Sequence, residues 1–126
     1  MKILAIESSC DETAAAIVEN GTKVLSSIIS SSADLHQQTG GVIPEIAARE
    51  QLKYIIPVIK QSFINSRLAQ NDINAIAVTY GPGLIGSLLV GVETAKTLAY
   101  AWNKPLVPVN HLVGHLYANW INDNNV

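Results

Sequence analysis

Residues 13–30, TAAAIVENGTKVLSSIIS, hold the strongest local fold signal in this sequence, two apolar runs on either side of Asn20-Gly21. Asn-Gly between apolar runs is typical of a tight β-hairpin, because both residues tolerate the positive φ angles that such a turn requires. A short apolar run at residues 3–6 precedes the hairpin and predicts a buried strand. The first part of the chain therefore predicts three strands in an antiparallel meander, with the polar residues 8–12 at its first turn.

The rest of the chain alternates helical and strand-like patterns. The expected helices are residues 44 to about 68, 85–102 and 112–121, and the expected strands are 75–80 and 106–109. Pro44 suits a first helical turn, and Pro57 is expected to kink or divide the first helix. The Ser- and Gly-rich residues 30–41 are expected to form a loop in which His36 is solvated.

This order of elements predicts an α/β fold. A meander followed by right-handed β-α-β connections gives a mixed five-stranded sheet, part antiparallel and part parallel, with helices on both faces. That layout is similar to one lobe of the ribonuclease H-like, actin-like (ASKHA) superfamily.

Composition limits the possible functions. The 126 residues predict one domain, and 48% are hydrophobic but only 14% charged, so part of the surface is expected to be covered by further chain or by a partner. A net charge of −2 gives no electrostatic footprint for nucleic acid. The lone Cys10 fits a reducing compartment. With neither a signal-peptide pattern nor an apolar run near the ~20 residues that span a bilayer, the expected location is the cytoplasm, with no membrane partner.

His111 and His115 form the main candidate site. Four residues apart on a helix, both imidazoles lie on one face and can reach a single cation, as in the zincin helix. The zincin motif places a Glu after its first His, and here Leu112 takes that position, so the pair lacks a peptidase base. A metal also needs at least a third protein ligand. The spacing alone leaves open a simpler alternative, capping or surface histidines.

Two loops are weaker candidates. The Ser- and acid-rich residues 8–13, SSCDET, suit phosphate contacts or a bound cation, or else form a polar turn without a ligand. Their position at the ends of strands favours a functional interpretation. The glycines of residues 81–87 suit either an anion at a helix N-terminus or close packing at a strand-to-helix turn, and the packing interpretation is favoured.

Four segments together resemble one family, the tRNA threonylcarbamoyladenosine biosynthesis transferases of the TsaD group. The matching segments, in family order and spacing, are residues 6–13 (IESSCDET), 40–45 (GGVIPE), 81–88 (GPGLIGSL) and 109–115 (VNHLVGH). Any one of them would be a weak signal, but four in register are specific.

The resemblance implies an activity and a site. The family transfers a threonylcarbamoyl group from threonylcarbamoyl-AMP to N6 of adenosine 37 in tRNAs that read ANN codons. It implies two actin-like lobes, with one divalent ion, iron or zinc, held by His111 and His115 and acting as a Lewis acid. Asp11 and Glu12 would face the cleft in a catalytic or orienting role. The implied partners are the tRNA, a shorter TsaB-like paralogue and a TsaE-like ATPase.

The chain is shorter than the family members. Residues 1–126 are expected to be the N-terminal lobe, without the second lobe that supplies the third metal ligand and adenylate-binding residues, and to be inactive alone. Two alternatives are a non-catalytic TsaB-like partner and an actin-like small-molecule kinase lobe. The paralogue lacks the histidine pair and the kinases do not need it, so His111 and His115 favour the transferase.

Overall fold

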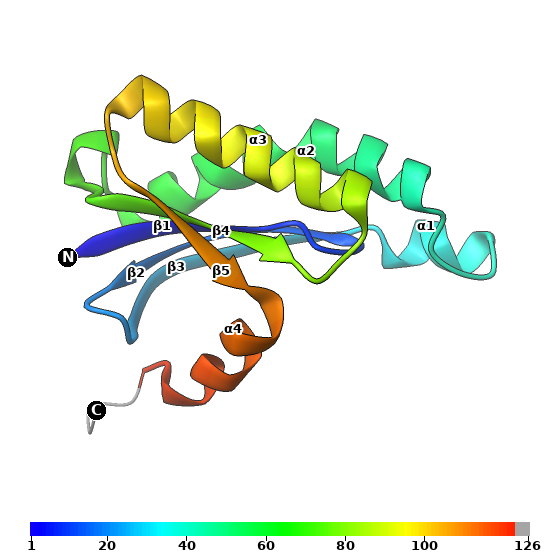
Figure 1. Cartoon of the computed structure of the whole chain (residues 1–126), viewed down its shortest axis with the longest axis horizontal. Coiled ribbons are helices and arrows are strands. Elements are labelled where there is room, and N and C mark those ends of the chain that lie inside the picture. Colours follow the sequence, from blue (N-terminus) through cyan, green and yellow to red (C-terminus); the bar gives the residue numbers. More distant parts are fainter. Residues whose placement is uncertain (123–126) are drawn as a thin grey trace.

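Five strands form one mixed sheet in the order β3-β2-β1-β4-β5 (Figure 1). The structure is a computed structural model that describes residues 1–122, with residues 33–35 described by their backbone alone. The strands are β1 (Lys2–Glu7), β2 (Glu12–Glu19), β3 (Lys23–Ser31), β4 (Ala75–Gly81) and β5 (Leu106–Asn110). The first three pair antiparallel, whereas β4 runs parallel to β1 and β5 runs parallel to β4. The predicted meander and parallel strands are confirmed.

The β2–β3 turn shows why the hairpin prediction succeeds. Asn20 and Gly21 adopt φ angles of 52° and 82°, in the left-handed region that Gly and Asn enter at low cost. The two strands then pair from Glu19 with Lys23 to Glu12 with Ser31, with one irregularity at Ile17/Val18.

Two long helices cover one face of the sheet. The helices are α1 (Ala33–Gln38), α2 (Pro44–Ser66), α3 (Ile85–Trp102) and α4 (His111–Tyr117), with 3₁₀ turns at Gln70–Asp72 and Ala118–Trp120. In Figure 1, α2 and α3 lie together above the sheet and α4 lies on the other side, below the end of β5. Helices therefore lie on both sides, as predicted. None of those in the described part of the chain has the length and apolar character needed to cross a bilayer.

The core lies between the sheet and the α2–α3 layer. Its buried side chains include Leu4, Ile6, Ile17 and Ile76 from the sheet, Ile55 and Ile59 from α2, and Val90 and Ala95 from α3. The opposite face carries small residues, among them Ala5, Ala14 and Ala16, which border a shallow cavity of about 150 Å³. Glu7 and Thr79 also line that cavity, so their side chains lie on the same side of the sheet as α4.

Three local predictions need correction, and a fourth is narrowed. Residues 30–41 are not a single loop, because β3 runs to Ser31 and α1 follows. His36 is buried rather than solvated, and its Nε2 lies 2.9 Å from Ser32 Oγ. Of the two outcomes expected at Pro57, a kink or a division, the division is excluded, because α2 continues through this residue. The last helix ends at Tyr117 rather than residue 121.

Ser8 fastens the first turn of the meander to α3. Its buried hydroxyl donates to Ser87 O at 2.7 Å and accepts from Gly91 N–H at 3.0 Å. In an α-helix, a carbonyl and the amide four residues later normally form a hydrogen bond. The Ser8 hydroxyl therefore bridges one such carbonyl–amide pair of α3. A β-carbon at position 91 would collide with Ser8 Oγ, which explains the glycine.

We expect Gly91→Ala to destabilise the chain by about 1–3 kcal/mol, because the new methyl displaces Ser8 and breaks both of its buried hydrogen bonds. Urea denaturation followed by circular dichroism measures the change. The matched control is Gly114→Ala in α4, where an added β-carbon meets no atom within 4 Å and a small gain from helix propensity is expected. Equal stability of the Gly91→Ala and wild-type chains would contradict this account of the turn.

Candidate functional site

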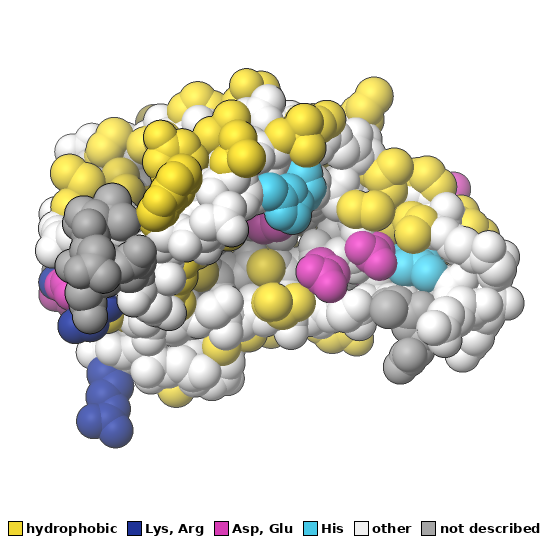
Figure 2. Space-filling model, turned by 90° about the horizontal axis from the view of Figure 1, so that it is seen from below, with side chains coloured by type: hydrophobic (Ala, Val, Ile, Leu, Met, Phe, Trp, Pro, Cys, Tyr) yellow, Lys and Arg dark blue, Asp and Glu magenta, His cyan; other side chains and the backbone are white. Residues whose placement is uncertain are grey.

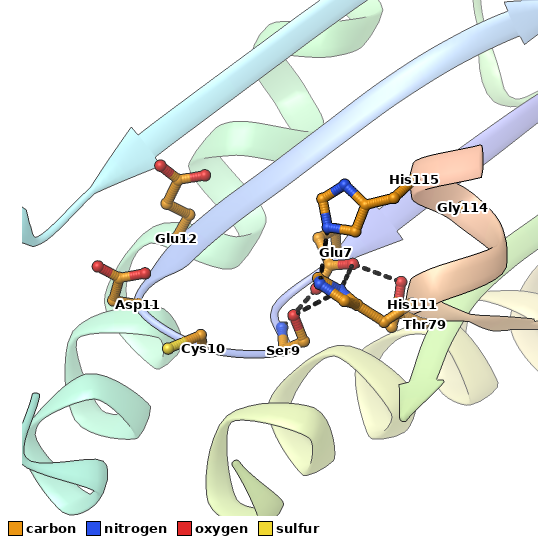
Figure 3. Close-up of a pocket in the computed structure, with 9 residues that line it drawn as sticks. All are labelled: Glu7, Ser9, Cys10, Asp11, Glu12, Thr79, His111, Gly114 and His115. Atoms are coloured by element: carbon orange, nitrogen blue, oxygen red, sulfur yellow. Dashed lines mark hydrogen bonds and ion pairs between the residues drawn. The ribbon is translucent and has the colours of Figure 1, made fainter. Parts of the chain in front are cut away.

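The candidate site lies where the carboxyl ends of three strands meet. β1 ends at Glu7, β4 brings Thr79, and β5 leads directly into α4 at His111. Parallel strands end at the same edge of a sheet, so these three residues come together although they are far apart in sequence. They border a cavity of about 290 Å³ (Figure 3), whose lining residues are Glu7, Ser9, Cys10, Asp11, Glu12, Thr79, His111, Gly114 and His115.

The two histidines face one another across a single turn of α4. Asn110 caps this helix, its side-chain oxygen accepting from Leu112 N–H at 2.9 Å and Val113 N–H at 3.3 Å, so the helix begins with His111 at the strand end. The Nε2 atoms of His111 and His115 are 2.9 Å apart. The two Nε2 atoms therefore lie next to each other, and both histidines line the cavity.

Glu7 orients the His111 ring from behind. His111 Nδ1 lies 3.3 Å from Glu7 Oε2 and 3.1 Å from Ser9 Oγ. An ionised carboxylate only accepts hydrogen bonds, so Nδ1 carries the proton and the Nε2 lone pair is left for the cavity. Thr79 Oγ1 donates to the same Glu7 oxygen at 2.6 Å.

The Glu7 carboxylate is held in its charged form. Partial burial acts to raise the pKa of Glu7, but hydrogen bonds from Ser9, Thr79 and His111 outweigh burial and hold the pKa below its ordinary value. Glu7 thus stays an acceptor for His111 at neutral pH. An outer carboxylate of this kind behind an imidazole is the usual partner of a metal-ligating histidine.

The donor set fits part of a metal site. The His111 and His115 Nε2 atoms lie 2.9 Å apart, at hydrogen-bond distance. Once both are unprotonated they could share an ion at the usual 2.0–2.1 Å, with an angle at the metal of about 90°. Among the residues that the structure describes, no group of three His, Cys, Asp or Glu side chains is placed to hold an ion. The described chain therefore offers two ligands and leaves the other positions open.

Asp11 and Glu12 line the same cavity at its other end. Figure 3 shows Asp11 on the turn between β1 and β2 and Glu12 at the start of β2, with Cys10 and Ser9 between these acids and the imidazoles. The structure brings the four predicted residues to one cavity but does not bring the acids to the histidines. Desolvation and the charge of Asp11 raise the pKa of the Cys10 thiol, so Cys10 is not an activated thiolate.

The comparisons with known proteins give the family. The model of the family described as TsaD, tRNA N6-adenosine threonylcarbamoyltransferase, matches residues 23–126. This chain belongs to that family. It is 59% identical over 121 residues to the tRNA N6-adenosine threonylcarbamoyltransferase of Thermomicrobium roseum and 57% identical over 119 residues to that of Moorella thermoacetica. These matches cover 96% and 94% of the chain but only 33% and 35% of the relatives, so the chain spans about a third of their length.

Solved structures support the fold alone. YeaZ from Pseudomonas aeruginosa superposes with a TM-score of 0.63 at 19% identity, over 87% of this chain and 45% of YeaZ. A second structure, an uncharacterized protein with similarity to peptidase YEAZ from Pseudomonas aeruginosa, gives 0.64 at 20% identity. Both agree with the ASKHA-type lobe predicted from the order of elements.

The glycine-rich turn of the family segment at residues 81–88 packs against the site loop. Leu84 N–H donates to Ser9 O at 2.8 Å, and a β-carbon at Gly83 would collide with that carbonyl. The packing interpretation is confirmed for Gly83. Glycine lets the chain approach the turn that carries Ser9, so this segment helps to shape the cavity.

Sequence reasoning missed Glu7 and Thr79 as site residues, and it included Ser9 only as a member of the candidate loop at residues 8–13. Glu7 was part of a matching segment, but only the acids that follow it were assigned a role. A usable signal existed, because a carboxylate that ends a buried parallel strand lies at the edge where such sheets place their ligands. The contact with His111 spans 104 positions, and it requires the register of β1, β4 and β5.

We expect Thr79→Val to destabilise the chain by about 1–2 kcal/mol near neutral pH, because it removes a buried hydroxyl that donates to a charged carboxylate. Because the pKa of Glu7 is lowered by folding, this cost should be fully present above the ordinary value of 4.5. It should shrink as the pH falls through the lower folded-state pKa. Denaturant unfolding at a series of pH values measures both effects.

The control for that experiment is Thr97→Val. Thr97 lies exposed on α3, where its hydroxyl donates only to Glu93 O at 2.8 Å, so its cost should be small and independent of pH in this range. An equal, pH-independent cost for both variants would show that Thr79 does not support Glu7.

Proposed function

We propose that this chain supplies the metal-binding part of a tRNA N6-adenosine threonylcarbamoyltransferase acting in the cytoplasm. The reaction moves a threonylcarbamoyl group from threonylcarbamoyl-AMP to N6 of adenosine 37 in tRNAs that read ANN codons. One observation supports this most directly. In a chain of this family, the Nε2 atoms of His111 and His115 converge to 2.9 Å at the carboxyl edge of the parallel strands.

His111 and His115 would hold one divalent ion, iron or zinc. When bound, the ion supplies a Lewis acid that polarises the carbonyl of the carbamoyl donor. Glu7 keeps the proton of His111 on Nδ1 and its ring in place, and so keeps Nε2 available. Further ligands would come from the part of the family proteins that this chain does not span.

Asp11 and Glu12 would act on the substrate rather than on the ion. Their place at the far end of the cavity from the imidazoles suits carboxylates that orient donor groups or accept a proton. The rigid turn between β1 and β2 would hold them at a fixed separation from the metal.

Exposed apolar side chains support further contacts. On α4 and the turn after it, Leu112, Leu116, Tyr117 and Trp120 are exposed. Figure 2 shows a band of hydrophobic side chains beside the hollow with the histidine and acidic side chains. This band and the open sheet face suit the second lobe. Exposed apolar residues of α2 and α3, such as Ile64 and Ile85, suit a TsaB-like paralogue, with a TsaE-like ATPase and the tRNA joining the full assembly.

The alternative functions have less support. A non-catalytic paralogue or a small-molecule kinase lobe shares the fold, and likenesses of 19–20% identity do not separate these possibilities. The family match and the paired Nε2 atoms favour the transferase.

Metal binding tests the site. We expect the chain to bind Zn²⁺ or Co²⁺ through His111 and His115. Loss of a residue that only supports a metal ligand usually weakens metal binding about 10–100-fold, and His111→Ala or His115→Ala should weaken it more. Titration calorimetry and the visible spectrum of bound Co²⁺ measure this. The control is His36→Gln, which removes the third histidine away from this cavity. A full metal complement in both alanine variants would exclude the assignment.

Transfer activity tests the function. We expect a chimera, in which this chain replaces the matching segment of the Moorella thermoacetica relative, to form threonylcarbamoyladenosine in tRNA when the donor and partner proteins are supplied. Mass spectrometry of tRNA nucleosides measures the product. The same chimera with His111→Ala should form at least about a hundredfold less, and the 126-residue chain alone should form none. Activity of the chain alone, or of the His111→Ala chimera, would refute the proposal.

A further inference from the structure

We propose that Gln51 is a positioning residue, whose side-chain amide holds the β1–β2 turn in the shape that orients His111. Gln51 lies on α2, in the buried stripe that also contains Ala47, Ile55 and Ile59. Only 1% of its surface is exposed. A polar amide in the buried face of a helix is costly unless it is hydrogen-bonded.

The two amide hydrogens of Gln51 are shared among three carbonyls of the turn. Gln51 Nε2 lies 3.2 Å from Ser8 O, 3.0 Å from Cys10 O and 3.1 Å from Glu12 O. Carbonyl oxygens only accept hydrogen bonds, so the nitrogen, and not the oxygen, must face them. The turn is thus folded around the end of one side chain.

Among the residues that the structure describes, the amide oxygen of Gln51 has no hydrogen-bond partner. Gln51 Oε1 is buried without a hydrogen bond, which costs stability. An unbranched apolar residue would fill a similar volume without this cost. Filling space therefore does not explain why position 51 is a glutamine. The need of three carbonyls for a hydrogen-bond donor does explain it.

The turn that Gln51 holds is the one that contacts His111. Every carbonyl from residue 8 to residue 12 accepts a hydrogen bond: Leu84 N–H serves Ser9, Ser32 serves Asp11, and Gln51 serves the other three. Between two carbonyls held by Gln51, Ser9 places its Oγ 3.1 Å from His111 Nδ1. Without the amide, the carbonyls on either side of Ser9 lose their donor, and the Ser9 backbone is held only through Leu84 and Glu7. The Ser9 hydroxyl would then be placed less firmly against His111 Nδ1.

The test uses the 126-residue chain without metal, donor or tRNA. Gln51→Met removes the donors but keeps an unbranched side chain of similar size, and Gln61→Met makes the same change at an exposed glutamine of α2 whose amide contacts only Asn65. Amide hydrogen exchange is measured by NMR for residues 9–12 and for the core strands β1 and β4. The ratio of the two exchange rates reports how well the turn is ordered relative to the core. The ¹⁵N resonances of the His111 ring at about pH 8 report which nitrogen carries the proton.

We expect Gln51→Met to speed exchange in the turn by about tenfold or more relative to the core strands, and to change His111 from one Nδ1–H tautomer to a mixture. Gln61→Met should leave both unchanged. The inference would be overturned if Gln51→Met kept the wild-type exchange rates in the turn and the wild-type His111 resonances. It would also be overturned if exchange in the turn and in the core strands became faster by the same factor.

A measurement on the wild-type chain guards against a variant that does not fold. The side-chain amide protons of Gln51 should exchange at least about tenfold more slowly than those of Gln61, and equal rates would also overturn the inference. The orienting role concerns the site of the proposed function. Both readouts are independent of metal and transfer, so a failure of one proposal can be told from a failure of the other.

Discussion

The hydrogen bond between His111 Nδ1 and the Glu7–Ser9 corner is the interaction on which the site depends. It joins the residue that begins α4 to the last residue of β1 and the turn after it. Without it, α4 would be attached to the sheet mainly through the end of β5, and its exposed ring nitrogens would have no fixed direction. With it, a short helix of seven residues, too short to be stable alone, presents one imidazole in a defined tautomer.

The β1–β2 turn can act as the fixed side of this contact because other elements hold its backbone. The Ser8 hydroxyl bridges a carbonyl and an amide of α3, and Leu84 N–H donates to the carbonyl of Ser9. Gln51, on α2, contacts three more carbonyls of the turn. Helices α2 and α3, which cover one face of the sheet, thus determine the geometry of the cavity on the side of α4. Substitutions on α2 or α3 can therefore change the site without lining it.

Much of this arrangement could be predicted from local chemistry. Asn20-Gly21 has a turn conformation that few other pairs adopt, and the apolar residues 85–102 match α3 to the residue. The histidine pair follows from helical spacing alone. Other features could not be predicted, because they arise from tertiary contacts. Residues 33–38 look like a polar loop but form α1, in which His36 becomes buried against Ser32. Glu7 looks like the polar end of a strand until the register of β1 with β4 places Thr79 and His111 beside it.

The two histidines are not equivalent, and their difference bears on how a complete site would form. His111 is held from behind by Glu7 and Ser9, whereas His115 is exposed and its ring contacts that of His111. One ligand is therefore pre-organised, and the other can turn to suit the ion and whatever further ligand arrives. The chain spans only about a third of its relatives' length. In the proposed site, a further ligand from outside this chain would have to meet the ion within a few tenths of an ångström. An adjustable His115 beside a fixed His111 would let the proposed site close around an ion when a further ligand docks, without moving the sheet edge that holds Glu7.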